Sequence, residues 1–262
     1  MSFARRLANE VGPRPAGSTR DELARALVAA EFRAAGWTVD EEPFPLPQGG
    51  ASANVVAWRG EDDRARIRPG RYVVIGAHLD TVEGSPGAND NASGVGVLVA
   101  LARELADETL EVPVVLVAFG AEEYQPSQPP RHHVGSEQFA ARHAGDVIAA
   151  LSVDMVANGE VTCICWLRGS PDTLAARLHT LAPQAGFAVR SEGDFSDHGP
   201  FAARLLPAAV LWTGKDGVYH TPRDTVDLLE VEDLRRAGDL TLAFLRSLAA
   251  ADSGGLRRSV QR

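Results

Sequence analysis

Acidic side chains and histidines occur at the points where apolar runs of this sequence stop. The segments that carry them are His78-Leu79-Asp80, Asn89-Asp90-Asn91, Glu122-Glu123, Asp154 and Tyr219-His220-Thr221-Pro222. In open α/β sheets, ligands bind beyond the carboxyl ends of the strands, so we expect these groups to meet there. A single histidine or aspartate in such a place is usually a structural residue or a turn former. Their joint occurrence is what predicts a functional site.

Carboxylates packed together would force one another to take up protons unless cations balance their charge. Two histidines with shared carboxylates supply the nitrogen and oxygen ligands that zinc accepts, and suit a bridged pair of ions. Such a pair lowers the pKa of bound water and polarises a carbonyl group. One carboxylate must stay free of metal to accept the proton of the water, and Glu122-Glu123 offers one residue for each task.

The elements that must position these residues alternate between strands and helices. Thr19-Arg20-Asp21-Glu22 is a capping-box pattern, which predicts a helix that ends at Gly36. The residues predicted for its apolar face are Leu23, Ala26, Leu27, Ala30 and Ala34. Apolar runs rich in Val and Ile predict strands at 51–58, 71–77, 112–119, 147–153, 161–166 and 207–212. Helical patterns cover residues 93–106, 135–144, 171–182 and 231–250.

This alternation predicts an α/β fold, with a mainly parallel sheet that helices cover on both faces. We expect a single domain over residues 1–252 and a flexible tail over residues 253–262. The segment Gln125 to Pro130, with three prolines and no apolar periodicity, is typical of a surface loop.

Composition excludes some classes of function. A net charge of −9 leaves no basic stripe for nucleic acid, and no apolar run is long enough to span a membrane. The first residues lack the apolar stretch of an export signal. We expect Cys163 and Cys165 to be reduced thiols, because residues two apart on a strand are poorly placed for a disulfide. These features predict a cytoplasmic protein.

In order and context, the motifs resemble those of the M28 family of zinc aminopeptidases over about residues 70–226. Further similar segments are Gly135-Ser136-x-x-Phe139-Ala140 and Ser196-Asp197-His198-Gly199-Pro200-Phe201. The resemblance implies a single-domain, three-layer α/β/α sandwich with a mixed, mainly parallel central sheet. It also implies that the substrate is a peptide with a free N-terminus, from which the first residue is removed.

The resemblance assigns a role to each residue of the site. Asp90 would bridge two zinc ions, and Co²⁺ or Mn²⁺ could occupy similar positions. The remaining ligands would be His78 and Asp154 for one ion, and Glu123 and His220 for the other.

Three more residues would take part in the chemistry. Glu122 matches the general base of the family, and Asp80 matches the carboxylate that accepts a hydrogen bond from the ligating His78. Tyr219 would stabilise the oxyanion through its hydroxyl. The Asp90–Asn91 bond is a candidate for a cis peptide bond, a feature that the family often shows after the bridging aspartate.

Two further pairs of residues are expected near the pocket. Asp197 and His198 are predicted to lie in a loop that lines or shapes the substrate pocket. His132 and His133 belong to an insertion, Gln125 to His133, and are predicted to be exposed to solvent. The insertion leaves the rim of the pocket, and therefore side-chain specificity, open.

Three alternatives remain. Glutaminyl cyclases resemble this pattern but bind one zinc ion and act as acyltransferases. A related group of carboxypeptidases and deacylases also shares the motifs, but its inserted dimerisation domain has little room between Asp154 and Tyr219. A non-enzymatic relative would be a metal-free binding protein on the same scaffold, and such proteins lose ligands that are present here. Oligomeric state and the physiological metal stay open.

Overall fold

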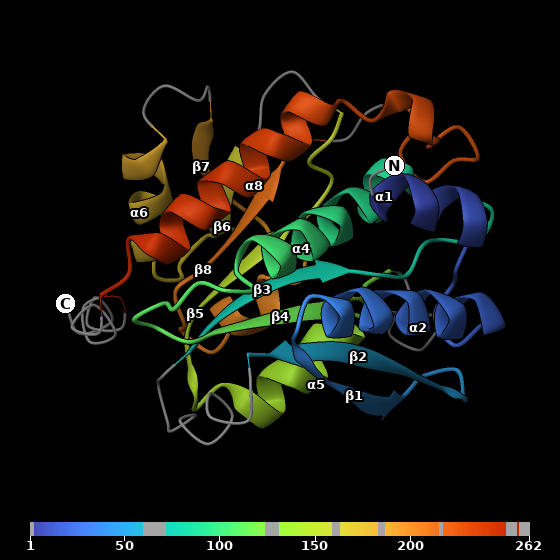
Figure 1. The fold of residues 1–262 in the computed structure, drawn as a ribbon, viewed down its shortest axis with the longest axis horizontal. Coiled ribbons are helices and arrows are strands. Elements are labelled where there is room, and N and C mark those ends of the chain that lie inside the picture. Colours follow the sequence, from blue (N-terminus) through green and yellow to red (C-terminus); the bar gives the residue numbers. More distant parts are fainter. Residues whose placement is uncertain are drawn as a thin grey trace.

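The computed structural model describes residues 3–59, 72–123, 131–158, 163–182, 187–214, 217–249 and Leu256. These residues form an eight-stranded sheet in the order β1-β2-β4-β3-β5-β8-β6-β7 (Figure 1). The strands are β1 (Thr38–Pro45), β2 (Ala51–Trp58), β3 (Tyr72–His78), β4 (Val114–Phe119), β5 (Val147–Val153), β6 (Cys163–Leu167), β7 (Ala188–Glu192) and β8 (Ala208–Trp212). Strands β4, β3, β5 and β8 are parallel neighbours, whereas β1–β2, β2–β4 and β6–β8 are antiparallel pairs. The mixed sheet with a parallel centre confirms the predicted fold class.

Helices cover both faces of this sheet. They are α1 (Phe3–Arg6), α2 (Thr19–Ala34), α4 (Ser93–Glu104), α5 (Val134–His143), α6 (Thr173–Leu181), α7 (Gly199–Ala202) and α8 (Val231–Arg246), with short turns η1 (Leu7–Val11), η2 (Ala88–Ala92) and η3 (Val226–Leu228). Figure 1 shows α4 and α8 on one side of the sheet and α5 on the other.

Alternate residues of the central strands enter two separate cores, as the pleat of a strand requires. Val73 and Ile75 of β3 belong to the core that also contains residues of α2, α4, α6 and α8. Tyr72 and Val74 of the same strand pack with Phe139 of α5 and with α7. The sheet is therefore buried on both faces, which produces the three-layer α/β/α sandwich.

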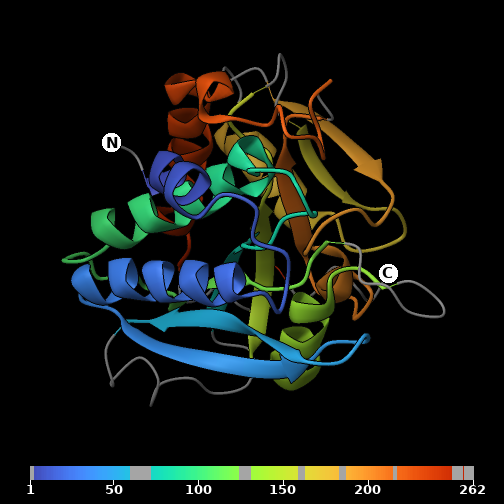
Figure 2. The same cartoon turned by 90° about the vertical axis from the view of Figure 1, so that its right-hand side faces the viewer.

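Two edge strands were absent from the sequence prediction. β1 contains charged residues and two prolines, and β7 contains Arg190 and Glu192, so neither has an apolar run. Both lie at an edge of the sheet, where one side of the strand needs no partner and charged or proline residues are tolerated. Figure 2 shows β1 and β2 at the edge of the sheet that lies beside α2.

The predicted apolar face of α2 was mostly wrong, because only Leu27 of its five residues packs against the core. The helix is capped by Ser18, whose side chain accepts a hydrogen bond from the Asp21 amide, and its buried face holds Ala24, Val28 and Phe32. Leu23 is 47% exposed. The buried face is centred on Phe32, the largest apolar side chain of the helix, and Leu23 stays exposed although it is larger than Val28.

The prediction of reduced thiols was also wrong. Cys163 and Cys165 form a disulfide within β6, with Cα atoms 5.5 Å apart. Side chains two residues apart project from the same face of a strand, and this Cα separation lies within the usual range for a disulfide. In the part of the chain described here, no helix is long and apolar enough to cross a membrane. The predicted tail falls outside the described residues, apart from Leu256.

Candidate metal centre

The five predicted ligands converge beyond the carboxyl ends of the parallel strands. His78 ends β3, Asp154 follows β5, and Glu123 follows β4. Nε2 of His78 lies 3.0 Å from Oδ1 of Asp90 and 3.3 Å from Oδ1 of Asp154. Nε2 of His220 lies 3.2 Å from Oδ2 of Asp90 and 3.1 Å from Oε2 of Glu123. Asp90 therefore faces one histidine with each of its two oxygens.

These atoms fit the donor set of divalent ions. One group is His78, Asp90 and Asp154, and a second is Asp90, Glu123 and His220, with the donor atoms of each group within 4.8 Å of one another. Oδ1 of Asp154 and Nε2 of His220 are buried, yet they form no hydrogen bond of acceptable geometry. Buried polar atoms normally have partners, so this arrangement is the one expected where a cation would join the donor atoms. Both groups could hold a metal ion.

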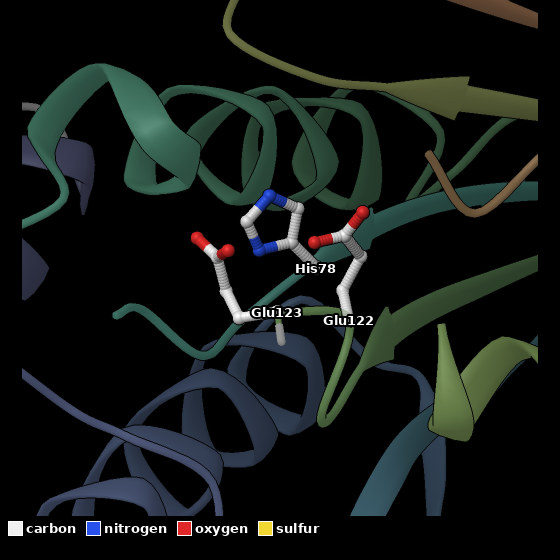
Figure 3. A group of neighbouring side chains, drawn as sticks. All are labelled: His78, Glu122 and Glu123. Carbon is white, nitrogen blue, oxygen red and sulfur yellow. The ribbon is translucent and has the colours of Figure 1, made fainter. Parts of the chain in front are cut away.

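A third group places His78 beside the two adjacent glutamates. Figure 3 shows the imidazole of His78 between the carboxylates of Glu122 and Glu123. This third group does not contain Asp90. Glu122 belongs to neither of the two groups that contain Asp90. Glu122 therefore lies beside the candidate ligands without being needed to complete either group around Asp90.

Burial and the neighbouring charged groups shift the pKa values of the site residues in opposite directions. Burial raises the pKa of Glu123, and the nearby Asp90 carboxylate raises it further, to about 8. Burial would also raise the pKa of Asp90, but its contacts with His220 and His78 outweigh burial and lower that pKa. Burial would lower the pKa of His78, whereas Asp154 and Glu122 raise it well above its ordinary value. Carboxylates this close favour bound cations.

Asp80 supports the site in a different way from the one predicted. Its carboxylate lies 4.0 Å from Nδ1 of His78, which instead contacts the main-chain oxygen of Asp80 at 3.1 Å. The carboxylate accepts hydrogen bonds from the amides of Glu122 and Glu123, at 2.9 and 3.2 Å. Both amides belong to the segment that follows β4, so the Asp80 carboxylate can accept a hydrogen bond from each of them. Asp80 therefore orients the glutamate pair.

The loop that carries Asp90 is held by Asp224, a buried residue to which the sequence analysis assigned no role. The amides of Asn89 and Asp90 donate to the two oxygens of the Asp224 carboxylate, at 2.8 and 3.0 Å. The Asp90–Asn91 peptide bond is cis, as the resemblance implied. Asp224 follows the Thr221-Pro222 segment, which was the available signal for its importance.

Asn91 links this loop to the strand that presents Asp154. Its amide group donates to the carbonyl of Val153 at 2.9 Å, and its oxygen accepts from the amides of Gly94 and Met155 at 2.8 and 3.2 Å. A Cβ atom at position 94 would collide with the Val153 carbonyl, so glycine lets α4 approach the end of β5. Asp90 and Asp154 are thereby held in one rigid framework.

Arg14 is a fully buried cation that the sequence analysis did not single out. Its guanidinium donates to the carbonyl oxygens of Leu79, Gly12, Pro86 and Gly87, at 2.6, 3.1, 2.7 and 3.0 Å. Burial lowers its pKa to about 10, so the group stays charged at neutral pH. Arg14 thus fixes both ends of the loop between β3 and η2.

Replacing Arg14 with alanine should lower the free energy of unfolding by about 3–5 kcal/mol, because several buried carbonyls lose their donor and nearby carboxylates lose a cation. Arg14→Lys should lose less, since an ammonium group retains the charge but reaches fewer carbonyls. Urea denaturation with an unchanged m-value provides the measurement. A change below about 1 kcal/mol for the alanine variant would contradict this role.

The candidate ligands open into a cleft of about 670 Å³. Besides the ligands, the residues that line it include Glu122, His133, Met155, Phe195, Trp212 and Tyr219. The ring of Tyr219 stacks on His220 with centroids 3.6 Å apart. Burial and the nearby Asp90 raise the pKa of Tyr219, so its hydroxyl remains a proton donor at neutral pH.

The loop that carries Asp197 and His198 borders the cleft, but neither of these two residues lines it. Their exposed fractions are 1% and 0%, and the cleft wall is formed by the preceding Asp194 and Phe195. The chain turns inward after Phe195, whose ring packs against His198 and Trp212 with centroids 5.3 and 4.6 Å apart. Burial raises the pKa of Asp197 to about 8 and lowers that of His198 to about 3, so both side chains are neutral at neutral pH and lie behind the wall instead of on it.

His133 also differs from the prediction. His132 is exposed, as expected, but the side chain of His133 is only 12% exposed and its Nε2 lies 3.0 Å from Oε1 of Glu122. Burial would lower the pKa of His133, whereas Glu122 raises it to about 9. Burial would raise the pKa of Glu122, but His78 and His133 outweigh burial and lower it. Residues 125–130 of the insertion lie outside the described part of the chain.

Comparison with known proteins places the chain in a family. The model of peptidase family M28 matches residues 54–245. Aminopeptidase YwaD of Bacillus subtilis is 31% identical over 183 residues, which cover 65% of this chain and 40% of that protein. The Escherichia coli protein YfbL is 28% identical, with coverage of 92% of this chain and 85% of YfbL. The chain thus spans less than half the length of YwaD but most of YfbL.

The solved structures that share the fold include an aminopeptidase and a glutaminyl cyclase. The zinc aminopeptidase BSAP from Bacillus subtilis has a TM-score of 0.83 at 18% identity, covering 97% of this chain and 96% of BSAP. Glutaminyl cyclase from Porphyromonas gingivalis has a TM-score of 0.78 at 23% identity, covering 93% and 95% of the two chains. At these identities the likeness concerns the fold alone, and both activities occur on it.

Proposed function

Because this chain belongs to peptidase family M28, we propose that it is a zinc aminopeptidase that removes the N-terminal residue from peptides. The observation that carries this proposal is the convergence of two donor groups on Asp90, each completed by one histidine and one further carboxylate. The first group contains His78 and Asp154, and the second contains Glu123 and His220. Nitrogen and oxygen donors in this combination suit zinc, and a shared aspartate suits a pair of ions.

The residues around the donor groups supply the remaining chemistry. When bound, zinc would lower the pKa of water and polarise the carbonyl of the scissile bond. Glu122, ionised and outside both donor groups, accepts the proton of the attacking water and transfers it to the leaving amine. The protonated hydroxyl of Tyr219 donates to the oxyanion that develops on the former carbonyl oxygen. The Asp80 carboxylate accepts a hydrogen bond from the main-chain amide of Glu122 and so keeps Glu122 in place.

The glutaminyl-cyclase alternative is favoured by the fold of the Porphyromonas gingivalis enzyme, which this chain shares. A cyclase with one zinc ion would need only one of the two donor groups. Here Asp90 turns one oxygen toward His78 and the other toward His220, and both groups are complete. This symmetry favours two ions and therefore the aminopeptidase.

A panel of peptides with free and acetylated N-termini, assayed with and without chelator, tests the proposal. We expect release of free amino acids from the unblocked peptides only, loss of this release with chelator, and recovery on adding zinc. Elemental analysis should find two zinc ions per chain. Cyclised product from an N-terminal glutamine peptide with one zinc ion per chain would favour the cyclase. Equal cleavage of blocked peptides would contradict an aminopeptidase.

Partners and location remain predictions. The net charge of −9 favours a peptide over a nucleic acid as the partner. The prediction of a cytoplasmic protein rested partly on reduced thiols. This argument no longer holds, because Cys163 and Cys165 form a disulfide. Fractionation of the producing cell, followed by detection of the chain in each fraction, tests the location directly.

A further inference from the structure

His133 is anchored to the same turn that carries Glu122. Its main-chain amide donates to the carbonyl oxygen of Glu122 at 2.8 Å, and the amide of Val134 donates to that of Ala121, also at 2.8 Å. Both Ala121 and His133 have a φ of 54°, a left-handed conformation that residues other than glycine adopt uncommonly. The chain on either side of residues 124–130 is thus pinned together, and α5 begins at this point.

The imidazole of His133 lies between two carboxylates. Its Nε2 is 3.0 Å from Oε1 of Glu122, and its Nδ1 is 3.6 Å from Oδ1 of Asp194. The side chain of Glu122 is 9% exposed, whereas that of Asp194 is 49% exposed. Asp194 can therefore hold the imidazole from the solvent side while the imidazole contacts one oxygen of Glu122 and leaves the other oxygen available.

We propose that His133, held by Asp194, is a positioning residue that fixes the Glu122 carboxylate by one oxygen so that the other faces the water. The proposal rests on the proposed function, in which Glu122 is the general base. A glutamate side chain has several rotatable bonds, and a general base must stay within hydrogen-bonding reach of the proton it abstracts. A displacement of about 1 Å at a reacting group can lower the rate by about 10²-fold. Fixing the carboxylate therefore raises kcat without a contact to substrate.

Four variants test this role: His133→Ala, His133→Gln, Asp194→Asn and the control His143→Ala. The control is matched because His143 also contacts a carboxylate, Glu42 at 2.8 Å, but lies at the opposite end of α5. For each variant, kcat and KM on an unblocked peptide, zinc content and the thermal unfolding midpoint are measured.

We expect His133→Ala to lower kcat by about 10- to 100-fold, with little change in KM or zinc content. His133→Gln should recover much of kcat, because its amide can still donate to Glu122. Asp194→Asn should lower kcat by about two- to fivefold, since an exposed charge contributes less. His143→Ala should match the parent chain in kcat.

A double variant separates positioning from an independent effect. Adding His133→Ala to Glu122→Gln should lower kcat by less than about twofold, because the group that His133 positions is already lost. Full kcat in His133→Ala, a change confined to KM, or additive losses in the double variant would overturn the proposal. If the histidine variants fail to fold, full kcat in Asp194→Asn overturns it. Failure of the unmodified chain to release any amino acid would instead defeat the proposed function, and this role with it.

Discussion

Replacing Glu122 with glutamine should lower kcat by about 10²–10⁴-fold while zinc content stays unchanged. Glutamine has nearly the same shape but cannot accept a proton, so the water is no longer activated by a base. Glu122 lies outside the two donor groups that share Asp90, and its main-chain amide would still donate to Asp80. Steady-state kinetics on an unblocked peptide and elemental analysis of the purified variant provide the two measurements.

The matched control is Glu22→Gln, which removes an exposed carboxylate from α2. We expect this variant to retain the kcat of the parent chain, so that a loss of kcat in Glu122→Gln cannot be ascribed to a change in net charge. Parent-like kcat in Glu122→Gln would remove the general-base assignment. Loss of zinc from that variant would instead place Glu122 among the ligands, as the group with His78 and Glu123 allows.

The second large effect concerns Asp90. Its replacement by alanine removes the carboxylate that both donor groups share, so bound zinc should fall from two ions per chain to none, and turnover should be lost. Asp154→Ala should behave differently, because the group of Asp90, Glu123 and His220 stays complete and can retain one ion. Elemental analysis of the two variants side by side therefore distinguishes a shared ligand from a ligand of one ion.

Thermal unfolding adds a readout that does not depend on activity. A metal that binds only the folded chain stabilises it by about 2.7 kcal/mol at a hundredfold excess over Kd, so zinc should raise the Tm of the parent chain. The shift should disappear in Asp90→Ala and be smaller than that of the parent in Asp154→Ala. Two zinc ions in Asp90→Ala, with an unchanged shift in Tm, would contradict the bridging assignment.

The candidate ligands could be selected from the sequence because their placement follows from local patterns. Apolar runs rich in Val and Ile predicted β3, β4 and β5, and parallel strands bring their carboxyl ends to one edge of a sheet. His78 ends β3, and Glu123 and Asp154 closely follow β4 and β5. The order of strands in the sheet was not needed for this step, since any parallel arrangement places the three residues on the same side.

Residues without a periodic signal were predicted poorly. β1 and β7 are edge strands with charged residues, and their apolar pattern is too weak to predict a strand. In α2, alanines lie all around the helix, so the pattern alone did not show that Val28 and Phe32 face the core. The contacts of α2 with β2 and α4 decided the orientation, and they bury Phe32 while Leu23 stays exposed.

The sequence by itself determined the central strands, the longer helices and the residue types at the ends of the parallel strands, because these depend on side-chain periodicity and chemistry within short segments. Tertiary structure decided which polar atoms meet: Arg14 with four carbonyls, Asp80 with the amides of the glutamate pair, and His133 with Glu122. These contacts join segments far apart in the chain. Their geometry is set by how helices and strands pack, and no local pattern of residues encodes that packing.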